Sequence, residues 1–290
     1  MTAPTGGMAP WSGRVYPRRM AALADIVAAL EGIAPLRLAA EWDSVGLLVG
    51  TRRTTIDRVM ACLTLTEAVA REAVRQRIDM ILAHHPLPFR PVGRITDDSS
   101  TGRILLDLLG GGIAVWSSHT AWDSAAGGIN DQLARMMQLD HAVPLQPDPS
   151  EPTVGIGRAG DAAAGVTVGG LATRLMNALG ASDRSVAIAG CQVAGDVDRP
   201  AGRVGIVCGS GGELVPVAAA AGCTTFVTGE IRLHDAIAAT AAGLSVIAVG
   251  HHASERFSMA GLAGRLADAV PGLSCEVSRA DVDPLAWITA

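Results

Sequence analysis

The feature that most constrains this fold is a repeated alternation of short apolar runs with segments of helical spacing. In the first half of the 290-residue chain, residues 78–83 and 113–118 are predicted to be buried strands. Residues 67–77, 101–112 and 127–139 have the apolar spacing and the terminal residues typical of helices. Strands that alternate with helices predict an α/β fold built on mainly parallel, buried sheet.

The second half repeats this plan. Its predicted strands are residues 185–190, 203–209, 224–229 and 244–250, and its predicted helices are residues 168–180, 213–222, 232–243 and 255–270. Each half contains a strand that ends at two neighbouring histidines, "DMILAHH" in the first and "LSVIAVGHH" in the second. We therefore expect two similar α/β lobes that face each other, with mixed, mostly parallel sheets.

A stretch rich in Pro, Gly, Asp and Ala separates the two halves. We expect residues 141–165 to be a connection between a first lobe at 19–140 and a second lobe at 166–290. Residues 1–18 are expected to be a disordered N-terminal tail, and they contain no continuous apolar segment of the kind found in signal peptides.

Composition excludes several classes of function. The net charge is −5, so binding to a nucleic acid or to an anionic membrane is not expected. The chain contains no lysine, which excludes a Schiff-base lysine and a P-loop lysine. The five cysteines are widely spaced and form no CxxC pair, which is typical of reduced core thiols. The sequence thus predicts a cytoplasmic globular protein.

Histidines and carboxylates follow three of the predicted strands. His84 and His85 follow the strand at 78–83, and His119 and Asp123 follow the strand at 113–118. The strand at 244–250 is followed by His251, His252 and Glu255. Ligands of parallel α/β sheets bind beyond the carboxyl ends of the strands, so we expect these side chains to converge. Imidazole and carboxylate suit Zn, Mn, Fe or Co, and two adjacent imidazoles fit two divalent ions per chain better than one.

Two further segments have chemistry that the sequence leaves open. Gly209, Ser210, Gly211 and Gly212 lie between a strand and a helix, where backbone N–H groups either hold a phosphate or only form a tight turn. Glu230, His234 and Asp235 lie at a predicted helix start, where they either cap the helix or support the site from behind.

Five motifs in series resemble the NIF-three-like family, whose members are usually named GTP cyclohydrolase 1 type 2 homologues. They are "EWDSVGLLVG" (41–50), "ILAHHPLPFRPVGRI" (81–95), "SSHTAWDSAAGGINDQLA" (117–134), "VTGEIRLHDAI" (227–237) and "VGHHASER" (249–256). The resemblance implies two intertwined, duplicated α/β lobes, a dinuclear metal site in the cleft between them, and a ring-like homohexamer. It places the metal ligands at His84, His85, Asp123, His251 and Glu255.

The sequence departs from the family pattern at three places. Ala121 and Trp122 replace the usual Asn-Leu pair, His252 replaces the usual tyrosine, and Thr64 stands where members often have an aspartate. The expected ligands survive these changes, and no carboxylate is available at position 64.

Two classes of function are consistent with these residues. Two metals about 3.5 to 4 Å apart, bridged by Asp123, favour hydrolysis of a phosphoester, a nucleotide or a related C–N bond, with His119 or His252 as proton carriers. The ligand would be a small molecule, with or without a phosphate group. The competing class is a metal-binding scaffold, metal-delivery protein or regulator without catalysis.

Overall fold

The computed structural model describes residues 20–183, 190–286 and 288. Its first sheet has the strand order β15-β4-β5-β6-β2, in which β2 alone runs antiparallel to its neighbour. The bounds are β15 (Ser274–Val277), β4 (Arg58–Cys62), β5 (Met80–Ala83), β6 (Ala114–Ser117) and β2 (Gly46–Val49). Every residue of β5 and β6 is buried, as expected for strands covered on both faces.

The second sheet has the order β11-β14-β13-β12-β10-β7, with a parallel centre, β14-β13-β12, and antiparallel strands on both sides. Its strands are β11 (Gln192–Ala194), β14 (Ser245–Ala248), β13 (Thr225–Glu230), β12 (Arg203–Ser210), β10 (Arg158–Asp161) and β7 (Asp140–Val143). Two short pairs complete the strands: β1 (Ala21–Ala22) with β3 (Thr55–Ile56), and β8 (Gln146–Pro147) with β9 (Gly155–Ile156).

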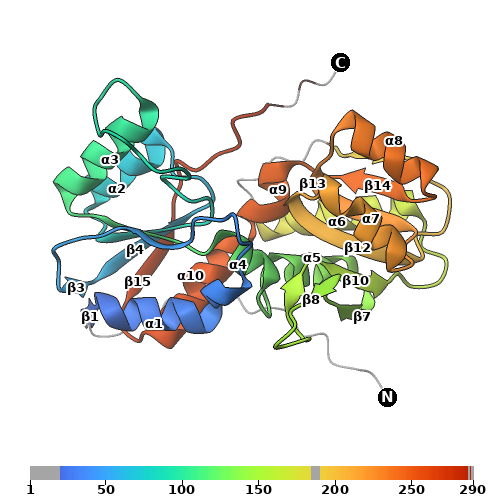
Figure 1. Ribbon diagram of the computed structural model, residues 1–290, viewed down its shortest axis with the longest axis horizontal. Helices are drawn as coiled ribbons and strands as arrows, with labels where there is room; N and C mark the ends of the chain where they lie inside the picture. Colours follow the sequence, from blue (N-terminus) through green and yellow to red (C-terminus); the bar gives the residue numbers. More distant parts are fainter. Residues whose placement is uncertain (1–19, 184–189, 287, 289–290) are drawn as a thin grey trace.

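Helices cover both faces of each sheet (Figure 1). On the first sheet, α2 (Glu67–Gln76) and α3 (Ser100–Gly111) lie opposite α1 (Leu23–Ile33) and α10 (Ser258–Ala269). On the second, α7 (Val215–Ala220) and α8 (Leu233–Ala241) lie opposite α5 (Ile129–Met137) and α6 (Val168–Ser182). The short helices α4 (His119–Ser124) and α9 (His251–Arg256) lie where the two lobes meet.

One apolar core runs through both lobes on the side of α1, α10, α5 and α6. It includes Ile26 of α1, Leu262 of α10, Leu133 of α5 and Leu175 of α6, all of them buried. Because close-packed side chains resist displacement, this shared core fixes the position of one lobe against the other. Residues at the junction are therefore held by both lobes.

The chain is intertwined between the lobes. After α9 in the second lobe it returns to the first, where α10 packs on β4 and β15 pairs in parallel with β4. Residues 141–165, expected to be a connection, include most of β7 and all of β8, β9 and β10, and β7 and β10 belong to the second sheet. The predicted two-lobed α/β fold with mixed sheets is confirmed. The first sheet is mostly parallel, whereas three of the five strand pairs in the second sheet are antiparallel.

Local signals explain several element boundaries. The Thr66 side chain accepts a hydrogen bond from the Val69 N–H at the start of α2, and the Ser99 side chain does the same for the Gly102 N–H at the start of α3. Gly112 ends α3 with a φ of 62°. The predicted tail and most of the predicted strand 185–190 lie outside the described residues.

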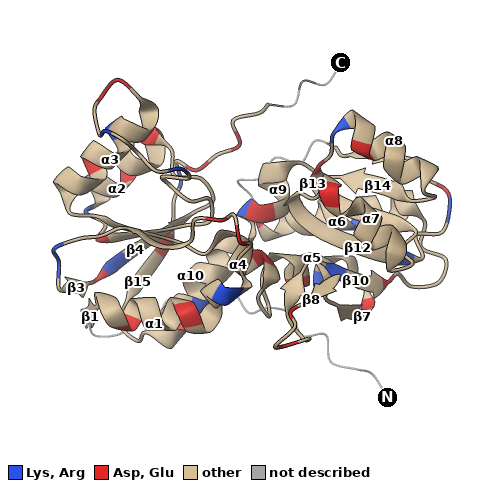
Figure 2. Ribbon diagram, in the orientation of Figure 1, with Lys and Arg blue, Asp and Glu red and all other residues tan. Residues whose placement is uncertain are grey.

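Charged residues are interspersed over both lobes (Figure 2). Among the residues that the structure describes, no helix combines the length and the apolar character that crossing a membrane requires.

Candidate metal centre

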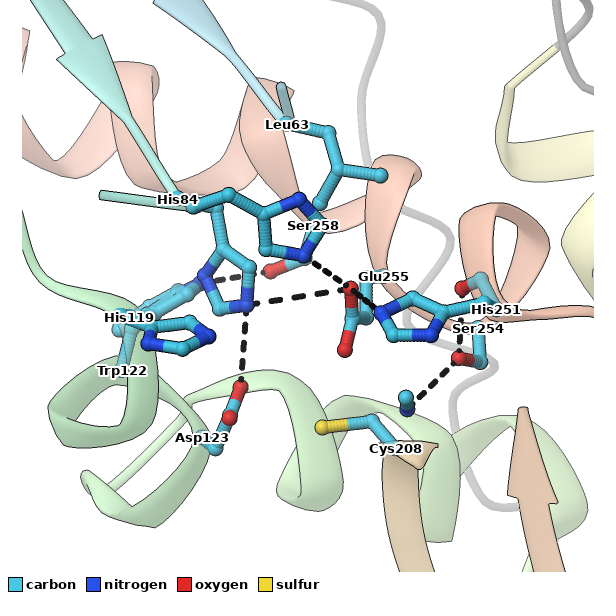
Figure 3. A network of polar contacts seen from close by, with 12 residues as sticks. Leu63, His84, His119, Trp122, Asp123, Cys208, His251, Ser254, Glu255 and Ser258 are labelled. Atoms are coloured by element: carbon cyan, nitrogen blue, oxygen red, sulfur yellow. Dashed lines mark hydrogen bonds and ion pairs between the residues drawn. The ribbon is translucent and has the colours of Figure 1, made fainter. Parts of the chain in front are cut away.

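Three strand ends bring imidazoles and carboxylates to the junction of the lobes. His84 and His85 follow β5, while His119 and Asp123 lie on α4, which follows β6. His251 and Glu255 lie on α9, which follows β14 of the other sheet. Figure 3 shows His84, His119, Asp123, His251 and Glu255 pointing toward one another.

Two groups of side chains have the spacing needed to hold metal ions. One consists of His84, His85 and His119, and the other of His85, His251 and Glu255. Within each group, one potential ligand atom per residue lies within 4.8 Å of the others. His85 belongs to both groups, so the two possible positions adjoin each other.

His84 and Asp123 contain buried polar atoms that the protein does not satisfy. His84 is fully buried, and neither of its ring nitrogens has a hydrogen-bond partner among the described residues. Asp123 Oδ1 is also unpartnered and lies 3.5 Å from His84 Nε2. Unsatisfied buried polar atoms are costly, so this pair fits a site that a cation completes.

Burial shifts the pKa values of both groups. Burial lowers the pKa of His84 well below its usual value, which keeps the imidazole neutral and able to act as a ligand. Burial, together with the charge of Glu255, raises the pKa of Asp123 to about 7. Without a metal ion, a proton therefore competes for Asp123 near neutral pH.

Glu255 occupies the centre of the cluster. Its Oε2 lies 3.1 Å from His85 Nε2, 3.2 Å from His251 Nε2 and 3.9 Å from His84 Nε2. Burial opposes its ionisation, but hydrogen bonds with His251 and His85 outweigh burial and lower its pKa well below the usual value. The same bond raises the pKa of His251 to about 9. The carboxylate oxygen that lies among these three imidazoles thus belongs to Glu255. That Asp123 bridges two metal ions stays a prediction.

Other side chains orient two of the imidazoles, those of His85 and His251. Thr64 Oγ1 lies 2.8 Å from His85 Nδ1, so the threonine at this position contacts the ring. Glu230 Oε1 lies 3.2 Å from His251 Nδ1. Partners of this kind fix the ring orientation and leave the other nitrogen facing the site.

Asp43 is a site residue that the sequence analysis did not single out. Its buried side chain contacts His119 Nδ1 at 2.7 Å through Oδ1, and its other oxygen accepts hydrogen bonds from the N–H and hydroxyl of Thr120. Burial opposes its ionisation, but the bonds with His119 and Thr120 prevail and lower its pKa. The available signal was a carboxylate within the motif "EWDSVGLLVG".

Asn130 of α5 links Asp123 to Cys208 of β12. The Asn130 side chain donates to the Asp123 carbonyl at 3.0 Å and accepts from the Cys208 N–H at 2.9 Å. Burial, and then the charge of Asp123, raises the pKa of the Cys208 thiol well above its usual value, so the thiol stays protonated. This arrangement ties α4 of the first lobe to β12 of the second at the site.

The glycine-rich loop after β12 does not present a set of free amides. The Gly209 N–H donates to Ser254 Oγ and the Gly211 N–H donates to Thr228 Oγ1, both at 3.0 Å. These two groups are therefore not available to a phosphate. Gly209 has another role, because a Cβ at this position would lie 2.2 Å from Glu255 Oε1.

Three predicted residues lie away from the cluster. His252 is buried, and neither of its ring nitrogens has a hydrogen-bond partner among the described residues. Burial lowers its pKa, while the charges of Asp283 and Asp281 act in the opposite direction. His234 is exposed on α8, and Asp235 lies beside Gly212. Consecutive helical residues point about 100° apart, so His251 faces the cluster and His252 cannot.

The fold and site define a two-lobed α/β protein with a candidate metal centre between the lobes. A sequence model of the Duf34/NIF3 (NGG1p interacting factor 3) family matches residues 21–284. The chain belongs to this family.

Curated relatives and solved structures agree with this assignment. The chain is 33% identical over 233 residues to a protein of Clostridium perfringens named "GTP cyclohydrolase 1 type 2 homolog", covering 80% of this chain and 86% of the relative. It is 33% identical over 238 residues to "NIF3-like protein 1" of Drosophila melanogaster, covering 81% and 78%. A Bacillus cereus protein related to NIF3 has a similar fold, with a TM-score of 0.84 at 21% identity over 93% of this chain and 100% of that one.

Proposed function

We propose that this protein binds two divalent metal ions and hydrolyses a nucleotide, a phosphoester or a related C–N bond. The observation that carries the proposal is the convergence of imidazoles and carboxylates from both lobes around the unpartnered, buried atoms of His84 and Asp123. His84, His85, Asp123, His251 and Glu255 would hold the ions. When bound, two such ions supply Lewis-acid stabilisation and a nucleophile at neutral pH.

The protein's own residues would position the ligand and move protons. His119 is the best placed proton carrier, since Asp43 holds its Nδ1 and its ring lies 5.2 Å from that of His84, centre to centre. A carboxylate behind an imidazole fixes the tautomer and stabilises the protonated ring. His252 lacks this geometry. The printed name of the curated relatives, "GTP cyclohydrolase 1 type 2 homolog", makes GTP one of the substrates to test.

The first experiment measures metal content. We expect the purified protein, reconstituted with Zn, Mn, Fe or Co, to hold close to two ions per chain, and Asp123→Ala to lose most of both. Elemental analysis that found one ion, unaffected by this substitution, would remove the dinuclear site.

The second experiment is a turnover screen on phosphoesters and GTP with metal-reconstituted wild type and His119→Asn. If His119 carries protons, the variant should keep its metals and slow hydrolysis about 10²- to 10⁴-fold. His119 also belongs to the group of His84, His85 and His119 that could hold a metal ion, so loss of metal in the variant would identify it as a ligand instead. Equal, trace-level rates in both proteins would favour a non-enzymatic metal-binding scaffold, metal-delivery protein or regulator.

We further propose that the protein is a cytoplasmic homo-oligomer, with a closed hexamer as the expected assembly. Light scattering that gave a monomer at micromolar concentration would overturn this assignment.

A further inference from the structure

An exposed aromatic pair lies beside the candidate metal centre. Trp42 precedes β2, and Phe89 lies in the loop after β5. Their ring centres are 6.3 Å apart with planes at 66°, and Trp42 also meets the His119 ring at 6.0 Å and 77°. Trp42 therefore contacts one residue of the His84–His85–His119 group directly.

Both rings present a large surface to solvent. Trp42 is 62% exposed and Phe89 46%, whereas Trp116 and Trp122 are almost completely buried. Large exposed aromatic rings next to a polar site are typical of ligand-binding surfaces, because a planar ligand can cover them. The ring contact with His119, which is itself held by Asp43, orients Trp42 before any ligand arrives.

The same surface continues into a groove with basic side chains. Phe89 lines a groove of about 710 Å³ together with Arg90, Arg94 and neighbouring residues of the 88–94 loop and Thr101. Arg94 pairs with Asp98, whereas Arg90 makes no ion pair with any described residue. An aromatic surface flanked by the exposed guanidinium of Arg90 fits a ligand that has both a planar ring and a negative charge.

We propose that Trp42 and Phe89 form a stacking surface for the planar heterocyclic ring of an anionic ligand whose reacting part meets the metal centre. This inference rests on the proposed function of that centre and narrows its ligands to compounds of the mononucleotide type. The ring would cover Trp42 and Phe89, and Arg90 would attract the anionic group.

The test is calorimetric binding to the metal-reconstituted protein. The probes are GMP, AMP, UMP and flavin mononucleotide, with ribose 5-phosphate and inorganic phosphate as probes that lack a ring. We expect at least one ring-containing probe to bind about tenfold more tightly than ribose 5-phosphate. Trp42→Ala should remove this advantage, Trp42→Phe should retain most of it, and Phe89→Ala should reduce it.

Leu233→Ala is the matched control, because it truncates an apolar side chain that is 72% exposed on α8, away from this surface. It should bind every probe as the wild type does. If Trp42→Ala also lost metal, Phe89→Ala and Trp42→Phe would decide, since Phe89 is not in ring contact with His119.

Two results would overturn the inference. One is a wild type that binds no ring-containing probe more tightly than ribose 5-phosphate, and the other is unchanged binding in both Trp42→Ala and Phe89→Ala. The binding assay requires no turnover, so the two proposals can fail separately. A protein that binds these probes through Trp42 but hydrolyses nothing loses only the proposed hydrolysis.

Discussion

Replacement of Gly209 by alanine tests whether Glu255 must stay where the structure places it. The added Cβ would lie 2.2 Å from Glu255 Oε1, and real Cβ atoms essentially never approach a neighbour within 3.0 Å. The carboxylate would therefore have to retreat by about 0.8 Å, whereas metal-ligand distances tolerate only about 0.2 Å. We expect the affinity for the divalent ion beside Glu255 to fall at least about 10- to 100-fold.

The substitution also has a cost in the backbone that must be separated from the effect on the metal. Gly209 has a φ of +61°, and an alanine in this left-handed region costs about 1 to 2 kcal/mol. Gly243 is the matched control, because its φ is +85° and a Cβ there would meet nothing within 4 Å. Gly243→Ala should lose a similar amount of stability and bind metal normally.

Metal affinity is measured by competition with a chromophoric chelator, and stability by thermal unfolding of the metal-free proteins. If Gly209→Ala and Gly243→Ala bound metal equally well, Glu255 would have room to move, and its central position would not matter for binding.

Three other perturbations test the metal site and the stability of the fold. Thr64→Val removes the contact with His85 Nδ1 and should weaken metal binding about tenfold in the chelator competition, while Thr64→Ser should not; equal affinities would mean that the contact does not orient the ring. Chelation of the metals should lower the Tm, because ions bind only the folded site, and an unchanged Tm would show that the site is not filled. The Glu72 carboxylate accepts hydrogen bonds from Ser278 Oγ and from the N–H groups of Arg279 and Ala280. We expect Glu72→Gln to lower the free energy of unfolding by about 2 kcal/mol. Burial opposes ionisation of Glu72, but these bonds lower its pKa below 4.5. The difference in unfolding free energy between wild type and Glu72→Gln should therefore be complete at pH 7 and narrow as the pH falls below 4.5. A difference in urea unfolding that stayed constant with pH would refute this.

The sequence by itself determined the fold class and the main polar residues of the site. Strand-like runs such as residues 78–83, followed at once by His84 and His85, predict imidazoles at the carboxyl end of a parallel strand, and the structure has this arrangement. The spacing of His251 and Glu255 by four residues predicts that both lie on one face of a helix, and they do, at 3.2 Å. Local periodicity and motif order contain this information because it depends on neighbouring residues.

Tertiary structure alone decided which partner each imidazole has. Asp43 is 76 positions from His119, and Thr64 is 21 from His85, so no local pattern announces these contacts. The return of β15 to the first sheet was also not visible, since its pairing with β4 joins residues more than 200 positions apart. The sequence left open whether the loop at Gly209 holds a phosphate or only forms a tight turn, and folding placed the hydroxyls of Ser254 and Thr228 on the amides of Gly209 and Gly211. Contacts of this range depend on how two lobes pack together, and the free energy of that packing comes from a core that no single segment contains.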